Sequence, residues 1–181
     1  MDQAESERLF QLTGTDSLRW LSIARSLKYS AEVLRDRLIE SMKIPAMFRQ
    51  TETEGLLMSS MLLLGLAIEN LVKGVYVAKN PEVVDERKID SSGWKTDGGH
   101  GIADFVKAFI SVDQEEEELL VRLQEYIIWA GRYPIPNKST RFYNSRYPVN
   151  KRYLNTRDFR IVDGLFDKLT EVLHNARKAS A

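Results

Sequence analysis

The chain has 181 residues and a mass of 20.8 kDa, the size of one domain that can bury a core without metals or disulfides. Its 26 basic and 26 acidic residues cancel, which excludes a global attraction to polyanions, and 43% hydrophobic residues is typical of a globular protein. The absence of cysteine excludes disulfides, thiolate metal sites and thiol nucleophiles.

The N-terminus carries no recognisable targeting signal, because residues 1–7 are acidic and no basic region precedes an apolar run. The most apolar stretch, residues 56–68, is shorter than the roughly twenty residues that a bilayer requires. We therefore expect a cytoplasmic protein without a membrane segment, with residues 1–14 as a flexible N-terminus.

Apolar residues recur every three or four positions over most of the remaining chain, which is the helical period. Four long helices are predicted over 16–43, 52–79, 114–129 and 156–178, and a short one over 100–110. Helix 52–79 is apolar nearly all round in its first half and is expected at the centre of the bundle. Gly and Pro punctuate two long loops, 80–99 and 131–155. The sequence thus predicts one all-α domain over 1–181, an up-and-down helical bundle.

Charge is unevenly distributed along the chain. The stretch from Arg132 to Arg160 contains eight basic residues and one acid, Asp158, so its net charge is +7. Aromatic residues are interleaved with these cations, and rings that stack on bases beside cations that neutralise phosphates are typical of single-strand nucleic-acid binding. We call residues 132–160 the basic aromatic segment. Its candidate phosphate- and base-contacting residues are Arg132, Tyr133, Lys138, Arg141, Tyr143, Arg146, Tyr147, Lys151 and Arg152.

The same segment has a second interpretation. Its tyrosines can pack it onto the bundle, while its arginines pair with acids of the same chain or of another subunit. Arg132 and Tyr133, which follow a predicted helix, either end that helix or clamp a phosphate beside a stacking ring.

Three residues are candidates for a catalytic or polar centre: Glu69, Lys73 and His100. Glu69 and Lys73 are four positions apart on the central helix, the favourable order for an ion pair, and can also orient His100 or Arg132. His100 opens a helix after two glycines, so it either caps that helix or acts as a general acid or base.

No metal or cofactor is expected. Glu171 and His174 have the Glu-x-x-His spacing of carboxylate-bridged di-iron bundles, but the chain lacks the second such motif that these sites need. Gly-rich phosphate loops and dinucleotide fingerprints are also absent.

Three segments carry a resemblance to a known family: Ala67–Lys73, Gly99–Ile102, and Ile128–Pro136 with its Trp-Ala-Gly-Arg-Tyr-Pro string. Together they resemble a group of poorly characterised bacterial helical proteins, which are similar to the HEPN superfamily. The resemblance covers residues 56–136. It implies a helical bundle, a homodimer, and a place in a toxin–antitoxin or anti-phage system, where many members cut RNA without a metal.

RNA-cutting members carry an arginine, four to six intervening residues and a histidine, in a composite site at the dimer interface. This chain departs from that motif, because Lys95 precedes His100 and Lys168 precedes His174 at the matching distance. A lysine ammonium can attract a phosphate as a point charge, but it cannot form the paired hydrogen bonds of an arginine guanidinium.

These observations predict a HEPN-like protein that binds RNA or a nucleotide through the basic aromatic segment. Two alternatives stay open at this point. One is a non-enzymatic subunit that docks an acidic protein partner, and the other is a metal-independent ribonuclease with a degenerate site.

Overall fold

The computed structural model describes residues 2–43, 45–94, 96–133, 135–136, 138–140 and 156–179, with the backbone alone at 46–50, 96–97 and 156. Within these ranges the protein is all-α, and a single antiparallel bridge between Val84 and Ile89 is the only β pairing. The elements in chain order are α1 (Gln3–Thr15), α2 (Ser17–Ser41), α3 (Ala46–Lys79), three 3₁₀ turns (Pro81–Val83, Ser91–Trp94 and Thr96–Gly99), α4 (Ile102–Lys107), α5 (Gln114–Glu125), a π turn (Tyr126–Ala130) and α7 (Thr156–Ala179).

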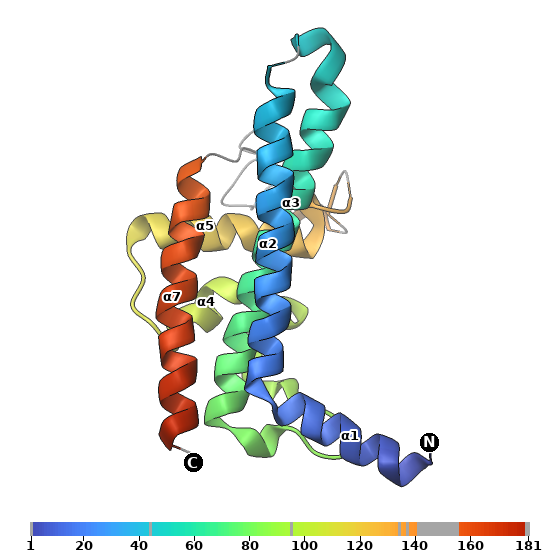
Figure 1. Ribbon diagram of the computed structural model, residues 1–181, viewed down its shortest axis with the longest axis vertical. Helices are drawn as coiled ribbons and strands as arrows, with labels where there is room; N and C mark the ends of the chain where they lie inside the picture. The colour runs from blue at the N-terminus through green and yellow to red at the C-terminus, as the bar shows by residue number, and fades with distance from the viewer. Residues whose placement is uncertain are drawn as a thin grey trace.

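The central helix is α3, as its composition predicts. It packs against α2, α7, α4 and α5, and Figure 1 shows α2, α3 and α7 running side by side while α5 lies across them. Leu64, Ile68 and Leu71 are fully buried at the helical spacing, so this stretch of α3 forms the middle of the core. Thr51–Lys79 is long and apolar enough to cross a membrane by length and composition alone, but half of its most apolar window is buried inside the bundle.

The N-terminal region differs from the prediction, because residues 3–15 form α1 instead of a flexible tail. The Asp2 side chain caps this helix by accepting a hydrogen bond from the backbone N–H of Glu5 at 2.8 Å. The Trp20 indole donates to the Gly14 carbonyl at 2.9 Å, and this bond ties the end of α1 to α2. The apolar residues of α1 stay largely exposed, so they lack the core-facing repeat that identified the other helices.

The predicted loop 80–99 is ordered into 3₁₀ turns over much of its length. Trp94 within it is 7% exposed, and its ring lies 5.1 Å from that of Tyr76 and 5.9 Å from that of Phe105, measured between centroids. This segment therefore covers part of the core instead of forming an open loop.

The predicted helix 114–129 is α-helical to Glu125 and continues as the π turn. Its N-terminus has a full capping box, in which the Asp113 side chain accepts from the Glu116 backbone and the Glu116 side chain accepts from the Asp113 backbone. The second predicted loop, 131–155, lies mostly outside the described residues.

Candidate functional site

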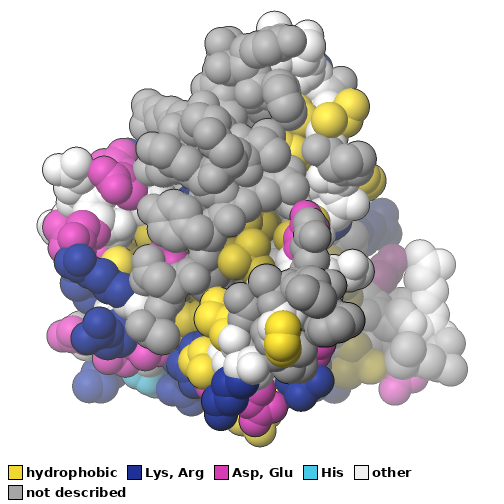
Figure 2. Space-filling view, turned by 90° about the horizontal axis from the view of Figure 1, so that it is seen from above, with side chains coloured by type: hydrophobic (Ala, Val, Ile, Leu, Met, Phe, Trp, Pro, Cys, Tyr) yellow, Lys and Arg dark blue, Asp and Glu magenta, His cyan; other side chains and the backbone are white. Residues whose placement is uncertain are grey.

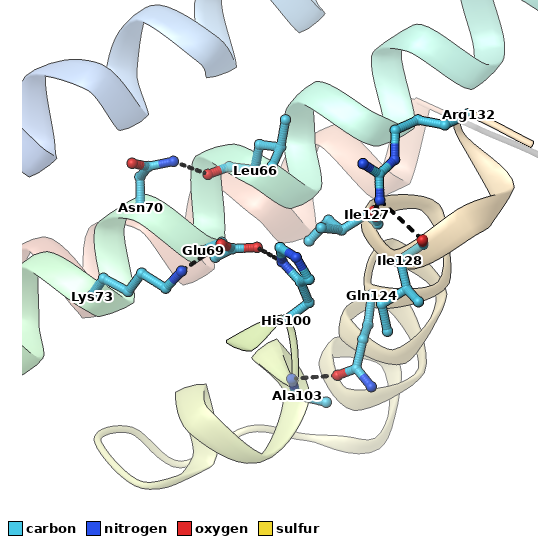
Figure 3. Close-up of polar contacts among 10 residues, drawn as sticks. All are labelled: Leu66, Glu69, Asn70, Lys73, His100, Ala103, Gln124, Ile127, Ile128 and Arg132. Atoms are coloured by element: carbon cyan, nitrogen blue, oxygen red, sulfur yellow. Dashed lines mark hydrogen bonds and ion pairs between the residues drawn. The ribbon is translucent and has the colours of Figure 1, made fainter. Parts of the chain in front are cut away.

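Glu69, Lys73 and His100 come together on the side of α3 that faces α4 and α5 (Figure 3). The Glu69 carboxylate accepts a hydrogen bond from the Lys73 ammonium at 2.6 Å through one oxygen, and its other oxygen lies 2.9 Å from Nδ1 of His100. A single carboxylate thus joins the helical ion pair to a histidine 31 positions away in the sequence.

Two glycines bring His100 to this position. Gly98 and Gly99 have φ values of 70° and 95°, a left-handed conformation that glycine adopts without steric cost. They turn the chain immediately before His100, and the buried Ile102 then anchors the first turn of α4. The glycines that mark the loop in the sequence therefore also set where the imidazole lies.

The three polar side chains are buried to different extents. Exposure of the side chain rises from 8% for Glu69 through 15% for Lys73 to 37% for His100. The Lys73 ammonium also lies 5.5 Å from the centroid of the buried Trp94 ring, a cation–π contact. The ion pair of Glu69 and Lys73 is thus shielded from solvent, and His100 is the member of the site that solvent reaches most easily.

The contact with Glu69 limits the hydrogen-bonding roles that the His100 ring can take. When Nδ1 carries a proton and donates it to the Glu69 carboxylate, the neutral ring leaves Nε2 as a hydrogen-bond acceptor. Within the described part of the chain, no hydrogen bond engages Nε2. The ring can accept a proton at Nε2, and the resulting imidazolium can donate a hydrogen bond to an anion.

The start of α4 is held against α5 by a side chain that the sequence analysis did not single out. The Gln124 side-chain oxygen accepts from the backbone N–H of Ala103 at 3.2 Å (Figure 3). This bond satisfies one of the free N–H groups of the first turn of α4. Trp94 was also missed, and its only sequence signal is a lone tryptophan in a polar stretch.

Arg132 serves the fold in this structure. One guanidinium nitrogen donates to the carbonyls of Ile127 and Ile128 at 2.8 and 3.0 Å, so it caps the end of the π turn (Figure 3). Of the two roles that the sequence left open for Arg132, the structure shows the helix-ending one. Tyr133 next to it is 53% exposed, with its ring 5.4 Å from the Arg132 guanidinium carbon, and is available to stack.

Most candidate residues of the basic aromatic segment lie outside the described part of the chain. Lys138 is exposed, whereas the other candidate residues lie outside the described ranges: Arg141, Tyr143, Arg146, Tyr147, Lys151 and Arg152.

The C-terminal end of the segment is tied to α5. Asp158 and Arg122 form an ion pair at 2.6 Å with side chains 4% and 7% exposed, and Arg157 pairs with Glu115. The Arg157 pair cancels one of the segment's positive charges. In the view from above, basic and acidic side chains alternate along the described rim of the molecule instead of forming one basic patch (Figure 2).

Glu171 and His174 are exposed on α7 and far along the chain from the other histidine. Among the described residues, no three His, Asp or Glu side chains are grouped so that they could hold a metal ion.

Comparison with known proteins gives no independent assignment of this site. No protein-family model, curated protein or solved structure matches the chain.

Proposed function

We propose that the protein binds RNA or a nucleotide, with a phosphate group held by His100 and by the cations of the basic aromatic segment. The observation that carries this proposal is the Glu69 carboxylate, which is buried yet bonded to both Lys73 and His100. One negative charge between two basic groups leaves a net charge of +1 when the imidazole is protonated. An anion in solution can approach this charge at the His100 side chain, which is 37% exposed.

Two features support a nucleic acid as the source of the phosphate. The basic aromatic segment begins one residue after Gly131, at the end of the π turn, and carries a net charge of +7 in sequence. Tyr133 offers an exposed ring beside a guanidinium, and stacking on such a ring contributes about 1–3 kcal/mol per base.

The experiment is a titration of labelled single-stranded RNA with the full chain, followed by fluorescence anisotropy at about 50 and about 200 mM salt. A protein that makes six phosphate contacts to a single strand should bind roughly 300-fold more weakly at the higher salt, and more contacts should weaken it further. Arg141→Gln/Arg146→Gln/Arg152→Gln should lower the slope of log affinity against log salt by about two, since each single-strand phosphate contact contributes about 0.7.

A matched control loses the same charge elsewhere. Arg8, Arg25 and Lys43 are exposed on α1 or at α2, and their joint replacement by Gln should leave the salt slope unchanged. Equal weakening by the two triple variants would show that net charge alone drives binding. Absence of binding at the lower salt would overturn the proposal and leave the docking of an acidic protein partner as the function to test.

The dyad of Glu69 and His100 favours one further activity, metal-independent RNA cleavage with His100 as general acid or base. Turnover of RNA that is lost in His100→Ala, while binding is retained within a few fold, is the result expected for cleavage. Binding without turnover in the wild-type protein excludes cleavage and leaves the binding proposal standing.

A further inference from the structure

An apolar groove lies between α1 and the first turns of α2. In Figure 1, α1 leaves the end of α2 at an angle, and residues of both helices line the groove. Its volume is about 400 Å³, which is typical of a small-molecule pocket. Leu9, Phe10 and Ile23 line it and are 43%, 41% and 51% exposed. Large apolar side chains that gather around one hollow and stay open to solvent indicate a binding surface.

Contacts within the chain hold the walls of this groove in place. The Trp20 indole, which lines the groove, donates to the Gly14 carbonyl at 2.9 Å and so keeps α1 against α2. A third wall is Ile89, which forms an antiparallel bridge with Val84. Val84 is 2% exposed and packs so tightly on α1 that a Cβ at Gly14 would lie 2.7 Å from it. The groove therefore needs no ligand to form, as is usual for small-molecule sites.

The groove has a positive charge at one place only. Of the described residues that line it, Arg19 alone is charged. The Arg19 guanidinium donates to Oγ1 of Thr13 at 3.3 Å, and among the described residues no carboxylate forms an ion pair with it. Asp16, three positions earlier, pairs with Arg177 at 3.7 Å instead. Arg19 thus offers its remaining N–H groups at the edge of an apolar surface.

These donors suit the head group of an acid. A guanidinium presents N–H groups in one plane, which matches the two oxygens of a carboxylate. One cation balances one negative charge, so a carboxylate fits better than a doubly charged phosphate. The Thr13 oxygen accepts from Arg19, and among the described residues its hydroxyl donates to no acceptor, so it can donate to the same carboxylate.

We infer that this groove binds an amphipathic carboxylate, a small molecule with an apolar chain and a single acidic group, such as a medium-chain fatty acid. The chain lies against Leu9, Phe10 and Ile23, and the carboxylate accepts hydrogen bonds from Arg19. This inference is independent of RNA binding, because no residue of the site around His100 lines the groove.

The first test measures the binding of decanoate that carries a bromine at the far end of its chain, below the concentration at which it forms micelles. Bromine quenches indole fluorescence only at short range. Saturable quenching is expected in the full chain, and Trp20→Phe should abolish most of it, since Trp94 and Trp129 are buried elsewhere. Unlabelled decanoate should also raise the melting temperature, because it binds the folded state.

Arg19→Gln tests the head group. It should weaken decanoate binding by about tenfold, because it removes a charge-assisted hydrogen bond, and leave decanol binding unchanged within about twofold. Arg25→Gln is the matched control. Arg25 is exposed on the same helix, but it lines a different pocket, between α2 and α7, so its loss should leave both affinities unchanged.

Ile23→Ser tests the apolar wall. It should weaken the binding of decanoate and of decanol alike, by about fivefold, because both lose the same apolar contact. Ile39→Ser is the control, since Ile39 is 43% exposed on the same helix and does not line the groove. Circular dichroism checks that every variant folds.

Three results would overturn the inference. The first is that bromodecanoate gives no saturable quenching; dimerisation or vesicle binding that Ile23→Ser weakens would then identify a second copy or a membrane as the occupant. The second is equal loss of decanoate affinity in Arg19→Gln and Arg25→Gln. The third is that Arg19→Gln weakens decanol as much as decanoate, which would mean that the groove does not recognise the acidic group.

Discussion

Glu69 makes two contacts in the candidate site, and only one of them can be predicted from the sequence. Its pairing with Lys73 follows from a spacing of four on a helix, which can be read directly from the sequence. Its contact with His100 depends on the turn at Gly98 and Gly99, and no local pattern gives the direction of that turn. The sequence could nominate the three residues, but only the tertiary structure shows that one carboxylate serves both partners.

Two glycines should respond to alanine in opposite directions. A Cβ at Gly93 would lie 2.4 Å from the Tyr76 ring, so Gly93→Ala forces this packed ring to move and should lower the free energy of unfolding by about 1–3 kcal/mol. Gly55 is exposed within α3 and has nothing within 4 Å of such a Cβ. Gly55→Ala should raise the free energy of unfolding by about 0.5–1 kcal/mol, because alanine favours the helix. Urea unfolding of both variants gives the comparison, and a stable Gly93→Ala would show that Tyr76 relaxes freely.

At the level of whole elements, the periodic helices were predictable and the unusual ones were not. α2, α3 and α7 bury apolar residues at a regular spacing, which is why the sequence predicts them, but α3 begins at Ala46, six residues before its predicted start at 52. α1 keeps Leu9, Phe10 and Leu12 exposed and shows no such stripe. The π turn at Tyr126–Ala130 gave no signal, because its apolar residues fit an ordinary α-helix equally well.

The junction of α5 with α7 depends on a buried ion pair that the sequence analysis did not find, since its members are 36 positions apart. Asp158→Asn should cost about 3–5 kcal/mol of stability, because it leaves the Arg122 charge buried without its carboxylate. The joint replacement Arg122→Met/Asp158→Leu should recover much of that loss, since it removes both charges.

The exposed pair at the same junction is the control. Arg157 and Glu115 are 61% and 53% exposed, so Arg157→Gln should change stability by less than about 1 kcal/mol. Chemical denaturation of the wild type and of the three variants decides the point. Similar losses for Asp158→Asn and Arg157→Gln would mean that burial gives the inner pair no special weight.

For the molecule as a whole, stability at alkaline pH should depend on Lys28. Burial lowers the pKa of its ammonium, but hydrogen bonds and charge from Asp163 on α7 and Glu32 outweigh burial, and the pKa is raised above 10.5. The stabilisation is complete below the pKa of the unfolded chain, near 10.4, and is lost as the pH rises through the higher folded value. The free energy of unfolding should fall more steeply above pH 10.5 in the wild type than in Lys28→Met. Parallel curves would mean that Lys28 stabilises both states equally.

The all-α class and the central position of α3 are the parts of the whole molecule that the sequence predicted. Both follow from composition and apolar spacing, which are properties of neighbouring residues in the sequence. The routes of 80–99 and of the α5 to α7 junction were not predictable, because they depend on contacts such as Trp94 with Tyr76 and Arg122 with Asp158 between distant residues.

The π turn is the place in this helix where the chain can best lose a residue. A π turn holds about one residue more than an α turn, so deleting one residue from Tyr126–Ala130 would leave a regular α-helix. Because the π turn has absorbed that residue, later residues would keep nearly the same direction around the helix axis, and Arg132 would stay close to the helix end that it caps. The same deletion within α5 would turn every later residue of the helix by about 100°. The effect of losing one residue therefore depends on which side of Glu125 it is lost.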